Sequence, residues 1–130
     1  MTHPLTSADE AAVQALYEDC CYIYDTARRE VTIPRSDGRR QKYAAVRFKQ
    51  QMDKAHREGR LVAAVTATVA RPTDGFSHLE AAQRPDLLLE TFVLDDSKPY
   101  HHLFDAHTVQ TARQRMDEYA RRNPPAAAPS

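Results

Sequence analysis

The amino-acid sequence predicts a small two-layer α+β domain, with helices packed on a short antiparallel sheet in the order helix, helix, strand, strand, helix. Three observations predict this class. Residues 8–27 and 39–58 carry apolar side chains at helical spacing. Residues 61–70 and 86–94 are β-branched or continuously apolar, which is typical of strands. The length of 130 residues suits a single core.

The first predicted helix, residues 8–27, begins at a capping box. Ser7 stands three residues before Glu10, so that each side chain can bond the other's backbone N–H. One face then carries mostly apolar residues at spacings of three, one, three, four and three: Val13, Leu16, Tyr17, Cys20, Tyr24 and Ala27. We expect Cys20 to pack in the core rather than to react.

Residues 28–40 read as a loop with one short edge strand at Val31–Ile33 and a turn at Ser36–Gly38. The second helix, Arg39–Glu58, follows, because Phe48, Met52 and Ala55 recur at helical spacing. Gly59 is suited to ending it.

Two strands are expected next. Residues 61–70 place Leu61, Val65 and Val69 on one pleat face. Residues 86–94 are an almost unbroken apolar run, which indicates a strand buried on both faces except at Glu90.

The last helix has two possible starts. Asp105 can cap a helix that begins directly after it, whereas Ser97 can cap a longer one with Pro99 in its first turn. The main domain is expected to cover residues 1–122, followed by a disordered proline- and alanine-rich tail over residues 123–130.

Composition bounds the class of protein. Leu, Ile, Val and Phe make up only 23 residues, and such a lean core is often completed by a second subunit, so we expect a homo-oligomer. Adjacent Cys20 and Cys21 cannot easily pair with each other, which favours a reducing compartment. No signal-peptide pattern and no apolar run of membrane-spanning length is present, so we expect a cytoplasmic protein without a membrane partner.

The charge sums to zero but is unevenly distributed. Residues 28–60 hold eleven Lys or Arg and four acids. In the second predicted helix, one face is expected to be basic, with Arg40, Arg47 and Lys54 at intervals of seven residues and Lys49 and Arg57 flanking them. Such cations could bind phosphates or an acidic protein, or they could form an ordinary charged outer face paired with Glu18 and Asp19.

A second candidate site is rich in histidine. The group consists of His101, His102, Asp105 and His107, whose imidazoles and carboxylate are of the kinds that bind zinc or iron. His78 or Glu90 could be a remote ligand. No established metal-binding spacing and no glycine-rich phosphate loop is present, so a divalent metal is only the alternative, and the leading expectation is that the protein has no cofactor.

The leading hypothesis is therefore a non-enzymatic binding or regulatory protein that engages an acidic partner, nucleic acid or protein, through the basic helix within residues 28–60. The alternatives are a small metal-dependent or histidine-based enzyme or sensor centred on residues 100–107, and a structural subunit of a homo-oligomer.

Overall fold

A computed structural model describes residues 7–34, 36–42, 46–71, 79 and 84–123, and it shows a mainly helical chain. The predicted α+β fold class is therefore wrong. The helices are α1 (Ser7–Glu30), α2 (Val46–Arg57), α3 (Leu61–Ala70), α5 (Leu89–Leu94) and α6 (Ala106–Arg122), with the 3₁₀ turns η1 (Pro85–Leu87) and η2 (His101–Leu103). Two short strands, β1 (Thr32–Pro34) and β2 (Arg40–Lys42), form a hairpin.

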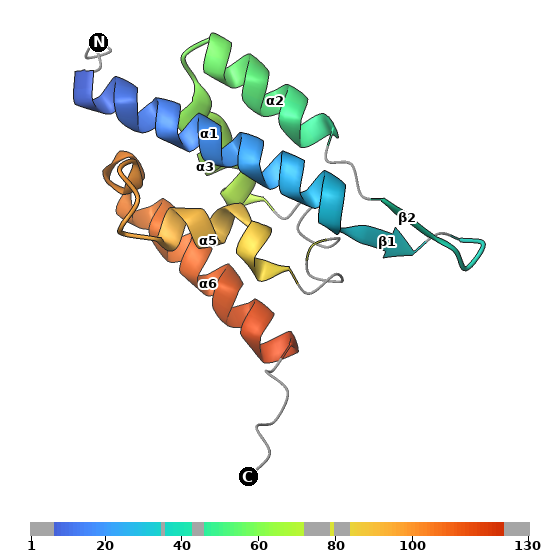
Figure 1. Cartoon of the computed structure of the whole chain (residues 1–130). Helices are drawn as coiled ribbons and strands as arrows, with labels where there is room; N and C mark the ends of the chain where they lie inside the picture. The colour runs from blue at the N-terminus through green and yellow to red at the C-terminus, as the bar shows by residue number, and fades with distance from the viewer. Residues whose placement is uncertain (1–6, 35, 43–45, 72–78, 80–83, 124–130) are drawn as a thin grey trace.

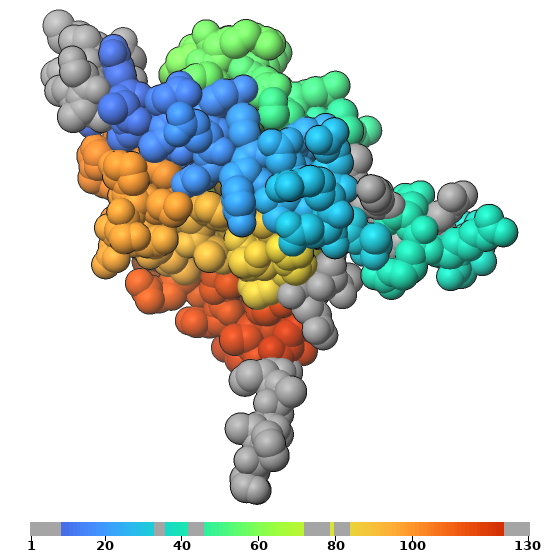
Figure 2. All heavy atoms as spheres, in the orientation of Figure 1, coloured from blue at the N-terminus to red at the C-terminus, as the bar shows by residue number. Residues whose placement is uncertain are grey.

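The long helix α1 runs across the molecule and separates α2 from the pair α5 and α6 (Figure 1). Helix α3 contacts α1, α2, α5 and α6, so it lies in the middle of the fold. The hairpin projects from the end of the molecule where α1 ends and α2 begins (Figures 1 and 2). The core is thus built between helices, and the hairpin lies outside it.

The prediction of a first helix is confirmed, and α1 extends three residues beyond the predicted end. Its acids Asp9 and Glu10 lie in the first turn and Arg28 and Arg29 in the last, which suits the helix dipole at both ends. The apolar residues on the buried face of α1 are Ala12, Leu16, Cys20, Ile23 and Ala27, at spacings of four or three.

Residues 61–70 form helix α3 and not the predicted strand. Leu61, Val65 and Val69 are all buried, at 1% exposure or less. Their spacing of four residues fits one face of a helix and one face of a strand equally well. Ala63 and Ala67 would share that face in a strand, but they are exposed, and Thr68 Oγ1 donates to the Ala64 carbonyl 2.9 Å away, one helical turn back.

Residues 86–94, the second predicted strand, form the turn η1 and the short helix α5. The predicted burial on nearly all sides is present, since Leu87, Leu88, Phe92 and Val93 are at most 8% exposed. A short apolar run does not distinguish a buried strand from a buried helix. Glu90, the expected exception, is itself buried, with 4% exposure.

The second helix begins later than predicted. It starts at Val46, and Arg40–Lys42 pairs with Thr32–Pro34 in the register Thr32 to Lys42 and Pro34 to Arg40. Strand β1 overlaps the predicted edge strand Val31–Ile33. Its partner, β2, lies within residues 39–58, which the sequence predicts to be helical. Gly38 in the connecting turn has φ of 83°, a left-handed conformation that glycine adopts at little cost.

Helix α6 takes the shorter of the two starts. Asp105 is its N-cap, and its carboxylate accepts a hydrogen bond of 2.7 Å from the Thr108 N–H. The extent of the domain, residues 1–122, stays a prediction, and residues 124–130 of the predicted tail lie outside the described residues. Among the described helices, none combines the length and the apolar character needed to cross a membrane.

Candidate functional site

Side chains of α1 and α2 interlock along an antiparallel helix pair. The Tyr17 hydroxyl donates a hydrogen bond of 2.7 Å to Asp53 Oδ1, and the Tyr17 ring stacks on His56 with centroids 4.1 Å apart. One helical turn nearer the start of α2, Lys49 lies 5.8 Å from the centroid of the Tyr24 ring. These contacts place the start of α2 beside the last turns of α1.

Lys49 belongs to this interface and not to an outer basic face. Its ammonium bonds both carboxylate oxygens of Asp53 at 2.8 Å. Each group stabilises the charge of the other: the Lys49 ammonium and the Tyr17 hydroxyl lower the pKa of Asp53, and the Asp53 carboxylate raises the pKa of Lys49. The prediction that Lys49 flanks a solvated basic face is therefore corrected, because its charge is already neutralised within the fold.

The opposite face of α2 is open to solvent and basic. Met52 and Ala55 point into the core, whereas the exposed positions carry Arg47, Gln50, Gln51, Lys54 and Arg57. Arg47 and Lys54 are two turns apart, about 10 Å along the helix. Long flexible cations and amides at this spacing can reach separate phosphates or acidic side chains.

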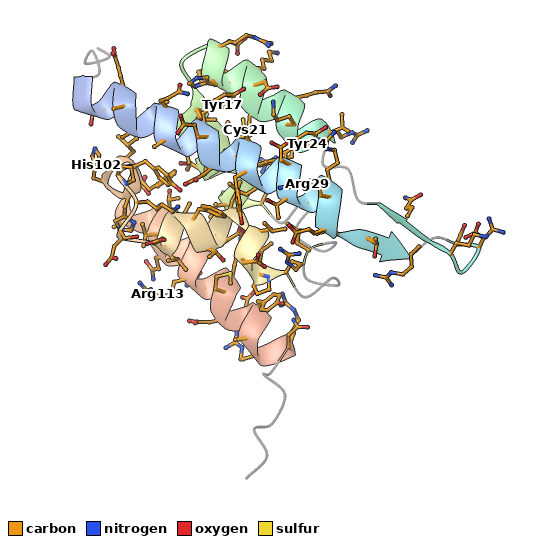
Figure 3. The ribbon with its side chains drawn as sticks, viewed as in Figure 1. Tyr17, Cys21, Tyr24, Arg29, His102 and Arg113 are labelled. Carbon is orange, nitrogen blue, oxygen red and sulfur yellow. The ribbon has the colours of Figure 1, made fainter. Side chains whose placement is uncertain are left out.

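More cations lie where α1 passes into the hairpin. Arg28 and Arg29 are exposed in the last turn of α1, and Arg39 and Arg40 are exposed on the hairpin. Figure 3 labels Arg29 at this end of α1 and Tyr17, Cys21 and Tyr24 along its length. Arg40 lies on β2 and not on α2, which corrects the predicted seven-residue line of cations. We use the name basic surface for these side chains: Arg28, Arg29, Arg39, Arg40, Arg47, Lys54 and Arg57.

The cations of the basic surface differ from several others in the protein. Within the described part of the chain, none of them has a carboxylate at ion-pairing distance. By contrast, Arg84 binds Glu30 and Asp86 at 3.1 and 3.0 Å, and Lys98 binds Asp19 at 3.1 Å. The predicted pairing of Asp19 with the basic helix is therefore wrong, and no described ion pair joins Glu18, the other expected partner, to that helix. The partners of Asp19 are Lys98 and the Tyr100 hydroxyl, which donates at 2.6 Å.

The local bonds of the basic surface leave its charge available. Arg40 donates through Nε to Thr32 Oγ1 at 2.8 Å and through Nη2 to the Thr32 carbonyl at 3.1 Å. Arg29 donates to the Asp25 carbonyl at 3.1 Å, and the Arg28 guanidinium lies 5.7 Å from the Tyr24 ring centroid. All these partners are uncharged, so they orient the arginines without neutralising them.

The histidine cluster is not brought together as a metal site. His101 Nδ1 lies 2.9 Å from the Val93 carbonyl, His102 Nε2 lies 2.9 Å from Asp9 Oδ1, and Asp105 caps α6. His107 is exposed on the first turn of α6. Among the described residues, no three His, Cys, Asp or Glu side chains are placed to hold a metal ion. His78 lies outside the described residues.

An open groove of about 380 Å³ lies between α1 and the α5 region. Its lining consists of Asp19, Tyr22, Asp86, Thr91, Phe92, Asp95 and Lys98. Each of its carboxylates already has a partner in the fold: Asp19 binds Lys98, Asp86 binds Arg84, and Asp95 accepts from Ser97. The charges of this groove are therefore used internally, unlike those of the basic surface.

Sequence reasoning missed Arg28, Arg29 and Arg39 as members of the site. The available signal is the density of basic residues between positions 28 and 40, a segment that the sequence predicts to be mostly loop. Comparison of the chain with family models, with curated proteins and with solved structures finds no significant match.

Proposed function

We propose that this protein is a non-enzymatic binding protein that engages nucleic acid through the basic surface. The observation that supports the proposal is the set of seven cations of the basic surface, which are exposed at one end of the molecule and on α2. None of them has a carboxylate at ion-pairing distance among the described residues. A polyanion releases counterions when such cations bind its phosphates, and this supplies affinity without a deep pocket.

The composition of the exposed face of α2 favours nucleic acid over an acidic protein. Gln50 and Gln51 lie between Arg47 and Lys54 on this face. Arginine and glutamine offer several hydrogen-bond donors each, which suits rows of phosphate oxygens and base edges. Nothing apolar and large accompanies them on this face except Val46, which is 44% exposed, whereas protein interfaces usually have an apolar centre.

The test is a binding titration of a fluorescent DNA duplex at several salt concentrations. The triple variant Arg47→Gln, Lys54→Gln, Arg57→Gln removes three charges from the basic surface. Its matched control is Arg71→Gln, Arg113→Gln, Arg121→Gln, which removes three exposed charges elsewhere; Arg113 lies on α6, on the other side of α1 from α2 (Figure 3). Both variants have the same net charge.

We expect the first variant to bind at least about tenfold more weakly at low salt and to show a shallower salt dependence, by about 0.9 in logarithmic slope for each lost phosphate contact. The control should stay within about twofold of the wild type. Equal losses in the two variants would show that only net charge matters. Preferential binding of poly-L-glutamate in the same assay would instead support an acidic protein as the partner.

A further inference from the structure

The hairpin carries two residues of the basic surface, Arg39 and Arg40. Among the described residues, strands β1 and β2 pair only with each other. Both full-chain views show the hairpin extending beyond the helices (Figures 1 and 2). Within the described part of the chain, the hairpin is therefore a projecting two-stranded ribbon.

This ribbon is anchored at its base, and its described tip, residues 36–41, is polar. Val31, directly before β1, is 1% exposed and donates its N–H to the Ala27 carbonyl at 2.9 Å. All residues from 36 to 41 are exposed. An isolated hairpin is marginally stable in water, and this one has no buried side chains at its tip to compensate. Its conformation is held by polar contacts, chiefly Arg40 to Thr32 and the Arg39 N–H to Asp37 Oδ1 at 3.0 Å.

The side chains on the ribbon suit the base edges and phosphates of nucleic acid. Its described exposed residues Ser36, Arg39, Arg40 and Gln41 carry hydrogen-bond donors. Arginine is the side chain that most often binds guanine in the major groove, and glutamine can bind adenine in the same groove. Arg40 binds Thr32 within the ribbon, whereas the side chain of Arg39 has no contact among the described residues and is available to a ligand.

The dimensions of the ribbon select among nucleic acids. Paired strands lie about 4.8 Å apart, so a two-stranded ribbon with its side chains fits the major groove of B-form DNA, which is about 12 Å wide. The major groove of an A-form RNA duplex is too narrow and deep for side chains to read, and single strands have no groove.

We propose that the hairpin Thr32–Lys42 is an arm that enters the major groove of double-stranded DNA while the cations of α2 bind the flanking phosphates. The proposal rests on the proposed function and narrows its ligand to duplex DNA. The chain order supports it, since β2 ends at Lys42 and α2 begins at Val46. With the ribbon in the groove, Arg47 is only a few residues away from it along the chain.

The experiment compares three probes of about 20 nucleotides or base pairs at one salt concentration: a DNA duplex, the single strand and an RNA duplex. The wild type should bind the DNA duplex about tenfold more tightly than either other probe. At saturating protein, methylation of guanine N7 by dimethyl sulfate reports whether the major groove is covered. We expect protected guanines within the bound DNA.

Arg39→Gln is the informative variant, because no contact of the Arg39 side chain within the described residues holds the hairpin, whereas Arg40 binds Thr32. It should lose most of the guanine protection at saturation and most of the preference for duplex DNA, and circular dichroism should show an unchanged fold. The α2 triple variant should bind more weakly but keep the protection pattern once saturated. Arg113→Gln is the single-charge control.

The outcomes separate the two proposals. Weaker binding by the α2 variant, together with equal affinity for the three probes or unprotected guanine N7, overturns the arm and leaves the basic surface standing. Identical behaviour of Arg39→Gln and Arg113→Gln overturns the arm as well. Absence of binding to any nucleic acid at low salt overturns both proposals.

Discussion

The phenol ring of Tyr17 lies flat against the imidazole of His56, with ring centroids 4.1 Å apart and planes 7° apart. Tyr17 also donates to Asp53, which in turn binds Lys49, so one side chain of α1 meets three of α2. His56 Nδ1 is buried and makes no hydrogen bond within the described part of the chain. Ring stacking is therefore the contact that holds His56 against α1. The contacts of Tyr17 with Lys49, Asp53 and His56 fix the position of α2, which carries Arg47, Lys54 and Arg57.

Tyr17→Phe should destabilise the protein by about 1 kcal/mol, since it removes the hydrogen bond to Asp53 and keeps the ring on His56. Urea unfolding measures the difference. Tyr22→Phe is the matched control, because Tyr22 is 52% exposed and its loss of a hydroxyl should change little. Equal stabilities of the two variants would contradict a stabilising role for the hydrogen bond.

The contribution of Asp53 to the free energy of unfolding should depend on pH. The pKa of Asp53 is lowered in the folded protein by Lys49 and by the Tyr17 hydroxyl. A carboxyl of this kind stabilises the fold above its unfolded pKa, about 3.9, and the contribution is lost as the pH falls through the lower folded value. Asp53→Asn should thus be less stable than the wild type near neutral pH and should approach it in strong acid.

The measurement for Asp53→Asn is the urea midpoint at about pH 7 and about pH 2. Asp25→Asn is the control, because Asp25 is exposed and its carboxylate has no cation partner among the described residues. If the urea midpoints of Asp53→Asn and the wild type differ as much at about pH 2 as at about pH 7, packing and not charge causes the difference.

The parts of the fold that sequence could predict are those set by local signals. The helix beginning near Ser7 follows from a 3.6-residue period, and the Asp105 cap of α6 is one of the two starts that the capping residues allow. The strand predicted at residues 61–70 failed because Leu61, Val65 and Val69 fit both periods. The choice was made by tertiary packing, since a helix lets this apolar segment contact four other helices without a paired strand.

The site was predictable only in part for a similar reason. Arg47, Lys54 and Arg57 are exposed on one face of α2, as a helical spacing places them. Lys49 differs because Asp53, four residues later, and Tyr17, far away in sequence, draw it toward α1. The pairing of Arg40 with Pro34 in a hairpin depends on contacts between separate segments, which periodicity does not report.

Cys20 and Cys21 should differ sharply in reactivity although they are neighbours. Cys20 is fully buried, and burial raises the pKa of its thiol to about 12, so the nucleophilic thiolate is scarce. Cys21 is only partly buried. In Cys20→Ala, the remaining Cys21 should react with a thiol reagent in native buffer. In Cys21→Ala, labelling of Cys20 should require unfolding and should accelerate across the urea transition; fast labelling in native buffer would contradict the assignment.

Glu90 should make the protein less stable as the pH rises through the mildly acidic range. Its side chain is 4% exposed, and burial raises its pKa to about 6, outweighing a backbone hydrogen bond at Glu90 and the Arg115 charge on α6, which both lower it. A raised carboxyl pKa means that the folded protein favours the protonated form, so stability falls from the unfolded pKa of 4.5 up to about 6 and then levels off. The total fall is about 2 kcal/mol.

Glu90→Gln tests this directly, because glutamine keeps the shape of the protonated glutamate and cannot ionise. We expect Glu90→Gln to match the wild type near pH 4 and to exceed its free energy of unfolding by about 2 kcal/mol near pH 7. Glu118→Gln, on the exposed face of α6, should leave the pH dependence of the wild type unchanged. A Glu90→Gln variant that is less stable at neutral pH would mean that the ionised carboxylate is stabilised by its surroundings, with Arg115 outweighing the cost of burial.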